Sequence, residues 1–125
     1  MNIEELREYC LNKPGVTEHL PFDEVTLVFK VQGKMFALLP TDHELSITLK
    51  CIPEYAEELR ERFDSIVPAF HMNKTHWNTI YMEQGAPEKL VKELIDLSYQ
   101  LVYDNLPRKL RVLKGEYAQL LKKCP

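Results

Sequence analysis

The spacing of apolar residues changes several times along the chain, from a helical period to an alternating one and back. Near the start, apolar residues stand at positions 3, 6, 10 and 11, as on one face of a helix. Asn2 and Glu5 have the spacing of a capping box, which favours a helix beginning at this point. The run Asn12-Lys13-Pro14-Gly15 ends the predicted helix, because proline lacks an amide hydrogen and glycine reverses the chain easily.

Between residues 25 and 51 the apolar period is two, which is typical of half-buried strands. Residues 25–31 alternate, the apolar run 35–39 follows after a short turn at 32–34, and residues 45–51 alternate again. We therefore predict an antiparallel meander with one apolar face and one polar face. The polar face is expected to stay partly open and to carry Thr26, Lys30, Ser46, Thr48 and Lys50.

The second half of the chain returns to helical spacing, interrupted by one strand. Pro53 and Pro87 are placed to begin helices, and a last helix follows Pro107. The β-branched and aromatic residues of 76–82 predict a further strand. The order α-β-β-β-α-β-α-α predicts an α+β fold, in which an antiparallel sheet carries helices packed on one face.

Composition places this fold in a single domain. The chain has 125 residues, of which 45% are hydrophobic, and we expect one domain over residues 1–108 followed by a basic helical extension over 109–125. No apolar run is long enough to span a membrane, and the acidic N-terminus does not resemble a signal peptide. We therefore expect a cytoplasmic protein without a membrane partner.

The cysteines indicate burial and not a disulfide framework. There are three, at positions 10, 51 and 124, with no C-x-x-C spacing. An odd and widely spaced set argues against both disulfides and a zinc finger. Cys10 and Cys51 share the phase of the apolar residues, so we predict that both thiols are buried.

Charge is distributed unevenly along the chain. From residue 108 onward there are six basic residues and one acidic residue, Glu116, so this segment has a net charge of +5. Since the whole chain has a net charge of −3, residues 1–107 carry −8. Such a basic segment can mark an anionic ligand or a protein partner. A lysine-rich solvated helix face explains it equally well.

The segment HMNKTHWNTI, residues 71–80, is the richest in side chains that could bind a ligand or take part in catalysis. His71 and His76 are five apart, which would place them on opposite faces of a strand, and no acid or cysteine stands nearby to complete a metal site. The chain also lacks a G-x-S-x-G motif and a phosphate-binding loop. We therefore predict no metal, no cofactor and no enzymatic activity.

Nucleic-acid binding fits this segment better than catalysis does. No Asp or Glu lies between Ser65 and Met82, while the stretch offers a cation, two amides, two imidazoles and the sole tryptophan. In the alternative interpretation these polar groups satisfy the backbone and Trp77 packs in the core. The predicted ligand is duplex DNA, and a protein- or small-molecule-binding adaptor using the same face is the second hypothesis. The predicted contacts are Lys30, Lys34, Lys50, Asn73, Lys74, His76, Trp77 and Asn78.

Six segments also carry a resemblance to a known family: YCLNKPGV (9–16), PF (21–22), VFKVQGKMFALL (28–39), LKCIPE (49–54), HMNKTHWNTI (71–80) and LIDLSYQLV (94–102). Together they cover about residues 3 to 108 and resemble the MmcQ/YjbR family of small bacterial proteins. The resemblance implies a CyaY-like fold, similar in shape to bacterial frataxins. It also implies DNA binding through a double-wing arrangement of hairpins.

Two positions depart from the pattern of that family. Ala69-Phe70 stands where members usually have Gly-Tyr, and Asp23 stands where many have glycine. The first change removes a phenol hydroxyl, and the second adds a negative charge that would not favour DNA. Kinship in fold with frataxins does not by itself imply iron binding.

Overall fold

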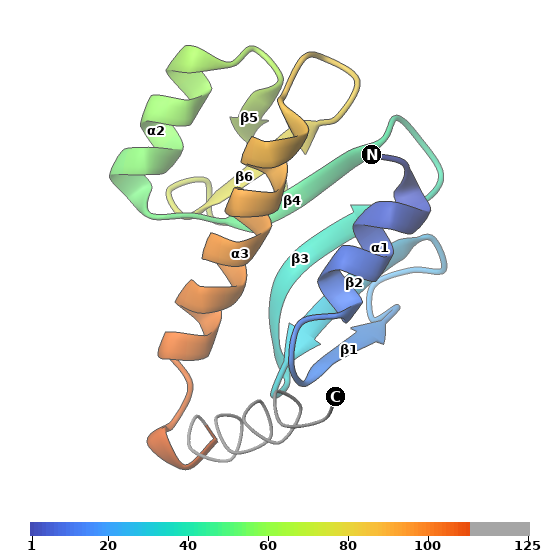
Figure 1. Ribbon diagram of the computed structural model, residues 1–125, viewed down its shortest axis with the longest axis vertical. Coiled ribbons are helices and arrows are strands. Elements are labelled where there is room, and N and C mark those ends of the chain that lie inside the picture. The colour runs from blue at the N-terminus through green and yellow to red at the C-terminus, as the bar shows by residue number, and fades with distance from the viewer. Residues whose placement is uncertain (111–125) are drawn as a thin grey trace.

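The computed structural model describes residues 1–110, which form three helices and six strands (Figure 1). Along the chain, one helix and four strands come first, and a second helix, two strands and a third helix follow. In chain order the elements are α1 (Ile3–Leu11), β1 (Val16–His19), β2 (Thr26–Val31), β3 (Lys34–Pro40), β4 (Ser46–Lys50), α2 (Pro53–Arg62), β5 (Ile66–Pro68), β6 (Trp77–Tyr81) and α3 (Glu88–Asp104).

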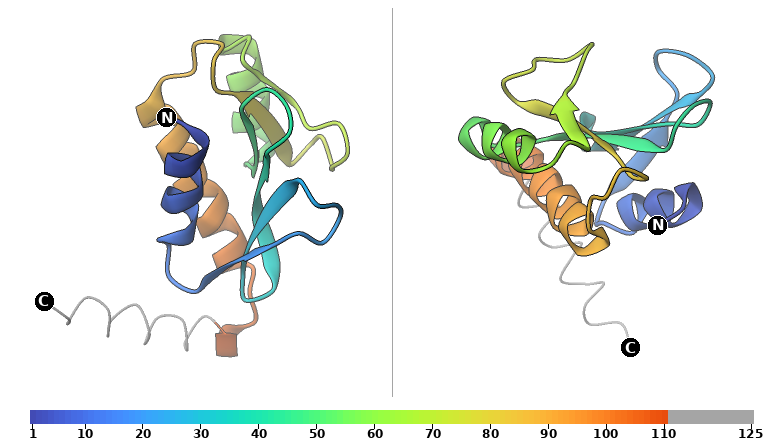
Figure 2. Two further views of the ribbon diagram at one scale, coloured as in Figure 1. Left: turned by 90° about the vertical axis from the view of Figure 1, so that its right-hand side faces the viewer. Right: turned by 90° about the horizontal axis from the view of Figure 1, so that it is seen from above.

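The strands form one antiparallel sheet in the order β1-β2-β3-β4-β6-β5. Figure 2 shows α1 and α3 on one side of this sheet, and two loops, residues 20–25 and 69–76, projecting from the other side. The predicted α+β fold with helices on one face is therefore confirmed. The predicted order omitted β1 and β5, which have only four and three residues and so show no alternation long enough to detect.

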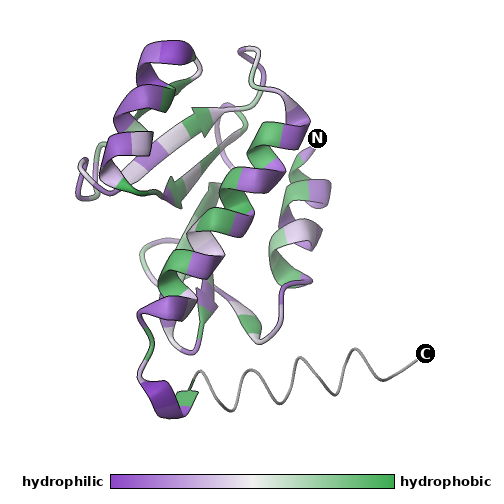
Figure 3. Cartoon of the chain, turned by 60° about the vertical axis from the view of Figure 1, so that its left-hand side comes forward, coloured by the Kyte–Doolittle hydropathy of each residue, from purple (hydrophilic) through white to green (hydrophobic). Residues whose placement is uncertain are grey.

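The main core lies between the sheet and the helices. Leu6 and Cys10 of α1, Leu59 of α2 and Ile95 of α3 are almost fully buried there against strand residues such as Phe29. Apolar and polar bands alternate along α3 in Figure 3, as expected for a helix with one buried face. The predicted burial of Cys10 and Cys51 is confirmed. Within residues 1–110, no helix is long and apolar enough to cross a membrane.

The N-terminal helix is held by polar contacts at its first turn and in its middle. The predicted capping box is present, with the Asn2 side chain accepting from the Glu5 amide at 2.8 Å and Glu5 accepting in return from the Asn2 amide. Further along the helix, Arg7 makes a two-pronged ion pair with Glu18 of β1. This pair lowers the pKa of the Glu18 carboxyl, because the guanidinium favours its charged form.

A register shift in β3 changes how the sheet meets α3. Phe29 of β2 faces Ala37, whereas the next residue, Lys30, faces Met35, so Phe36 is an extra residue in β3. Phe36 and Ala37 are both buried in the helix-side core as a result. Strands β3 and β4 are paired only at Ala37–Leu49 and Leu38–Thr48, and beyond this point they separate.

The hydroxyl of Ser98 in α3 occupies this point of separation. It accepts a hydrogen bond from the Lys50 amide at 2.9 Å and donates one to the Phe36 carbonyl at 2.5 Å. Extending the β3–β4 register by one residue would place these two backbone groups opposite each other. Ser98, which is fully buried, thus bridges a donor and an acceptor that the sheet leaves unpaired.

The face opposite the helices is less open than predicted. Ser46 and Thr48 are only 2% and 9% exposed, so the expectation that they lie on an open face is wrong. They line one cavity together with Ala69 and Met72 of the 69–76 loop. A loop returning over the sheet leaves no periodic signal in the sequence.

The predicted basic extension over 109–125 lies almost entirely outside the described residues and stays a prediction.

We predict that Ser98→Ala lowers the free energy of unfolding by about 1–3 kcal/mol, because the Lys50 amide and the Phe36 carbonyl lose their partner. Ser65→Ala is the matched control. Ser65 is also buried, but its hydroxyl has no hydrogen-bond partner within the described part of the chain. Urea unfolding followed by circular dichroism should show a large loss for Ser98→Ala and little change for Ser65→Ala. Equal losses would contradict the bridging role.

Candidate functional site

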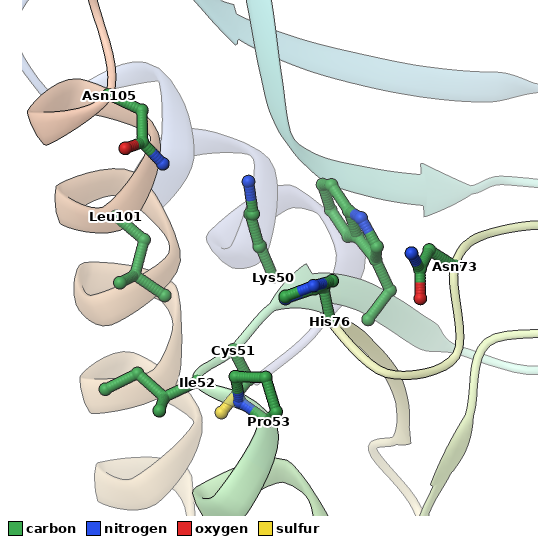
Figure 4. Close-up of a pocket in the computed structure, with 9 residues that line it drawn as sticks. Lys50, Cys51, Ile52, Pro53, Asn73, His76, Leu101 and Asn105 are labelled. Carbon is green, nitrogen blue, oxygen red and sulfur yellow. The ribbon is translucent and has the colours of Figure 1, made fainter.

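A surface pocket of about 430 Å³ lies where the end of β4, the start of β6 and the C-terminal part of α3 meet (Figure 4). We call it the Lys50 pocket. Four of the eight predicted contact residues line it, namely Lys50, Asn73, His76 and Trp77. The other lining residues are Cys51, Ile52, Pro53, Leu101 and Asn105.

Strand pairing brings the two sides of this site together. Lys50 of β4 lies opposite Trp77 of β6 in the antiparallel register, so their side chains emerge on the same face of the sheet. The Cys51 amide donates to the His76 carbonyl at 2.7 Å and extends this pairing by one step. Pro53 then begins α2, so the positive end of that helix dipole borders the pocket.

Asn73 shapes the loop that closes the pocket. Its side-chain oxygen accepts from the Thr75 amide at 2.9 Å, and its carbonyl accepts from the amides of His76 and Trp77 at 3.1 and 3.0 Å. A side-chain oxygen that binds the backbone two residues later makes an Asx turn. Asn73 therefore orders the chain just before β6. In Figure 4 its side chain stands on the opposite side of the pocket from Leu101 and Asn105 of α3.

The described residues of the pocket include a cation and no acid. Among residues 1–110, Lys50 makes no ion pair and no Asp or Glu lines the pocket. Figure 4 shows the Lys50 side chain between α3 and His76. Trp77 is only 8% exposed and lies outside the helix-side core cluster, so it acts as a wall of the pocket. Among residues 1–110, no three His, Cys, Asp or Glu side chains gather closely enough to hold a metal ion.

Asn78 lies on the other face of the sheet from its neighbour Trp77. Its amide nitrogen donates to the Ala56 carbonyl at 3.2 Å, and its side-chain oxygen accepts from Arg60 at 2.8 Å. The residue is 3% exposed, so it joins β6 to α2 inside the protein. The Asn78 side chain is therefore not brought together with the other predicted contacts.

The remaining predicted lysines lie outside the pocket. Lys74 is exposed on the 69–76 loop, and its ammonium nitrogen is 5.7 Å from the centre of the Phe70 ring. It also borders a neighbouring cavity that contains Glu54 and Glu57 of α2, so its surroundings are mixed in charge. Lys30 and Lys34 belong to the β2–β3 hairpin, with Lys34 exposed at the turn.

Sequence reasoning missed the helix side of the pocket. Leu101 and Asn105 come from the end of α3, far along the chain from the HMNKTHWNTI segment. Asn105 follows the last residue of that helix, where its backbone amide caps the Tyr103 and Val102 carbonyls. No spacing rule links these positions to Lys50, because the link is made by the packing of α3 on the sheet. Pro53 was recognised only as the start of a helix.

Cys51 and His76 are neighbours in the pocket, yet their arrangement does not indicate a nucleophile. Cys51 is 4% exposed, and burial raises the pKa of its thiol. Catalytic cysteines need a lowered pKa, because the thiolate is the reactive form. In Figure 4 the sulfur atom of Cys51 points toward Pro53 and away from His76.

Comparison with known proteins gives a consistent set of relatives. The sequence model of the YjbR family matches residues 11–101. "Uncharacterized protein YjbR" of Escherichia coli K12 is 35% identical over 114 residues, which cover 90% of this chain and 97% of the relative. "Uncharacterized protein YbdF" of Escherichia coli O157:H7 is 34% identical and covers 85% and 88% of the two chains.

Solved structures agree with these sequence matches. A crystal structure of a Deinococcus radiodurans protein superposes with a TM-score of 0.86 at 37% identity, over 91% of this chain and 88% of the other. The crystal structure of a Pseudomonas syringae protein superposes with a TM-score of 0.71 at 30% identity, over 82% and 99% of the two chains.

We predict that Cys10 and Cys51 resist alkylation in the folded protein. Burial raises the pKa of the Cys10 thiol to about 12 and also raises that of Cys51, so both stay protonated at neutral and mildly alkaline pH. A Cys124→Ser variant leaves these two as the remaining thiols. Its reaction with iodoacetamide, followed by mass spectrometry, should be slow until denaturant is added. Rapid modification of Cys51 in the native state would instead reveal a reactive thiol in the pocket.

Proposed function

The chain belongs to the YjbR family, and from this premise we propose that it is a binding protein without catalytic activity whose ligand is duplex DNA. We assign the Lys50 pocket to a DNA phosphate. A phosphate group needs a cation, neutral hydrogen-bond donors and the absence of nearby carboxylates.

The observation that carries this proposal is that Lys50 has no ion-pair partner among residues 1–110 and that no described Asp or Glu lines its pocket. An ammonium group that no described carboxylate pairs is available to an external anion. The amide of Asn105 and the imidazole of His76 supply hydrogen-bonding groups beside it. The positive end of the α2 dipole adds to the favourable field for an anion.

The lysines outside the pocket extend the contact along a nucleic-acid backbone. Lys74 is exposed on the loop that closes the pocket, and we assign it to a neighbouring phosphate. Lys30 and Lys34 lie on the hairpin whose β3 strand is bridged to the Lys50 amide through Ser98. Phosphate contacts of this kind fix the position of a protein on DNA without reading the base sequence.

The other pocket residues take supporting roles in this proposal. Asn73 orders the loop through its bonds to Thr75, His76 and Trp77, and so sets the positions of its neighbours. Trp77, with 8% of its surface exposed, supports the wall of the pocket and offers little surface to a ligand. Asn78 has no direct contact in the proposal, because Arg60 and Ala56 use both ends of its amide.

A protein- or small-molecule-binding adaptor is the second candidate function. It is favoured by three large apolar side chains exposed on the projecting loops: Leu20 at 50%, Phe22 at 65% and Phe70 at 76%. Exposed apolar groups gathered at one side of a protein are typical of interaction surfaces. A protein partner for the basic segment 109–125 belongs to the same hypothesis.

Binding of a mixed-sequence duplex is expected to quench the emission of Trp77 and to weaken steeply as salt is raised. Trp77 is the sole tryptophan and lines the pocket, so its emission reports on this site. Lys50→Ala should lower affinity and reduce the slope of log K against log salt by about one, because one phosphate contact is lost. Lys74→Ala should have a similar effect. A fluorescence titration at several salt concentrations measures both quantities.

Lys92→Ala provides the matched control for these variants. Lys92 lies on α3 and pairs with Glu88, so its removal should leave affinity and salt slope unchanged. Absence of any change in emission, together with no mobility shift of the duplex, would contradict DNA binding. Affinity that does not depend on salt would instead favour the adaptor hypothesis.

A further inference from the structure

A second cavity, of about 320 Å³, lies on the sheet face opposite the helices. Its floor is formed by side chains of β4 and β6, and one wall is the first half of the 69–76 loop. The second half of the same loop closes the Lys50 pocket through Asn73 and His76. One short loop therefore forms part of both sites. The volume is at the lower end of the range for small-molecule sites, so it suits a single ring system.

The floor of this cavity is polar but carries no charge. The hydroxyls of Thr48 and Thr79 are hydrogen-bonded to each other at 2.8 Å, and Ser46 and Tyr81 stand opposite each other in the next pair on this face. No Asp, Glu, Lys or Arg is among the described residues that line the cavity, although His43 and His71 also line it. Hydroxyl groups both donate and accept, so they can pair with the mixed edge of a heterocycle.

The rim of the cavity presents an aromatic ring. Phe70 lines the cavity, is 76% exposed, and belongs to no core cluster. Because most of the Phe70 side chain is exposed, its burial adds little to the stability of the fold. A planar ligand can stack on the exposed face of the ring. Leu38, Ala69 and Met72 supply further apolar contacts along the walls.

The positive charge of Lys74 stands beside this ring, and Lys74 is not among the residues that line the cavity. The ammonium nitrogen of Lys74 is 5.7 Å from the centre of the Phe70 ring. If a neutral ring system that carries a phosphate bound here, its ring would occupy the cavity and its phosphate would contact Lys74. This combination of a flat neutral heterocycle and a neighbouring anion describes a nucleotide unit.

We propose that this cavity binds an unpaired nucleobase, which stacks on Phe70 and pairs its edge with the hydroxyls of the floor. The shared chemistry is the nucleobase, supplied either by a free nucleoside or by an unpaired position in a strand. The strand source rests on the proposed DNA-binding function, with Lys74 as the phosphate contact. The cavity then adds base recognition to the phosphate site at Lys50.

The test is an NMR titration of the ¹⁵N-labelled full chain with adenosine, thymidine and a short single-stranded oligothymidine. Saturable shifts are expected at the amides of Thr48, Thr79, Phe70 and Met72. Phe70→Ala should weaken the apparent affinity by about tenfold, because stacking on an aromatic ring is lost. Phe70→Tyr keeps the ring and should keep the affinity.

Phe22→Ala is the matched control, since Phe22 is similarly exposed on the opposite loop but does not line the cavity. It should leave nucleobase binding unchanged. Absence of shifts at the cavity with every probe would overturn the proposal. Equal losses in Phe22→Ala and Phe70→Ala would also overturn it, because they would show unspecific apolar contact.

The probes also separate the two sources and the two proposals. Equal affinity for nucleosides and oligothymidine assigns the site to a free nucleoside, and tighter, salt-dependent binding of the oligonucleotide assigns it to a strand. If the duplex binds through Lys50 but no probe shifts the cavity, the nucleobase site fails while the proposed function stands. If nucleosides bind and the duplex does not, the proposed function is contradicted while the nucleobase site stands.

Discussion

The arrangement of the pocket depends on the two hydrogen bonds of the Ser98 hydroxyl, because they join α3 to the sheet where β3 and β4 separate. The hydroxyl satisfies the Phe36 carbonyl, which the register shift of β3 removes from the ladder, and the Lys50 amide, which β3 no longer reaches. A buried backbone group without a partner costs about 1–3 kcal/mol. With both groups satisfied, the strands can diverge, and Lys50 faces a pocket bounded on its far side by the end of α3.

The 69–76 loop converts this local geometry into two adjoining sites. Asn73 orders its second half, while Ala69 is fixed to the sheet by a hydrogen bond from its amide to the Trp77 carbonyl at 3.1 Å. The loop therefore has anchored ends, with the exposed Phe70 and Lys74 between them. On one side lies Lys50, which has no acid partner among residues 1–110, and on the other lies a cavity floored by hydroxyls. These are complementary to a phosphate and to a base.

The sequence predicted those features that depend on local pattern. The first three predicted helices, the longer strands, the capping box at Asn2 and the burial of Cys10 follow from spacing and end signals, and all are present. Four predicted contacts also share one pocket, because strand pairing places Lys50 beside the HMNKTHWNTI segment. The role of Ser98 could not be predicted, since it depends on a one-residue register shift in a distant strand. Asn78 was placed among the contacts because its side-chain amide can make two hydrogen bonds to a base, whereas alternation along β6 turns it toward α2.

Lysine acetylation followed by mass spectrometry, with and without a mixed-sequence duplex, tests the central claim most directly. Each lysine reports its own contact, so the measurement locates the binding face without any substitution. The account predicts that duplex DNA protects Lys50 and Lys74 most, and leaves Lys89 and Lys92 of α3 as reactive as in the free protein. Protection confined to the lysines of α3, or no protection at all, would contradict the assignment of the DNA site to the Lys50 pocket.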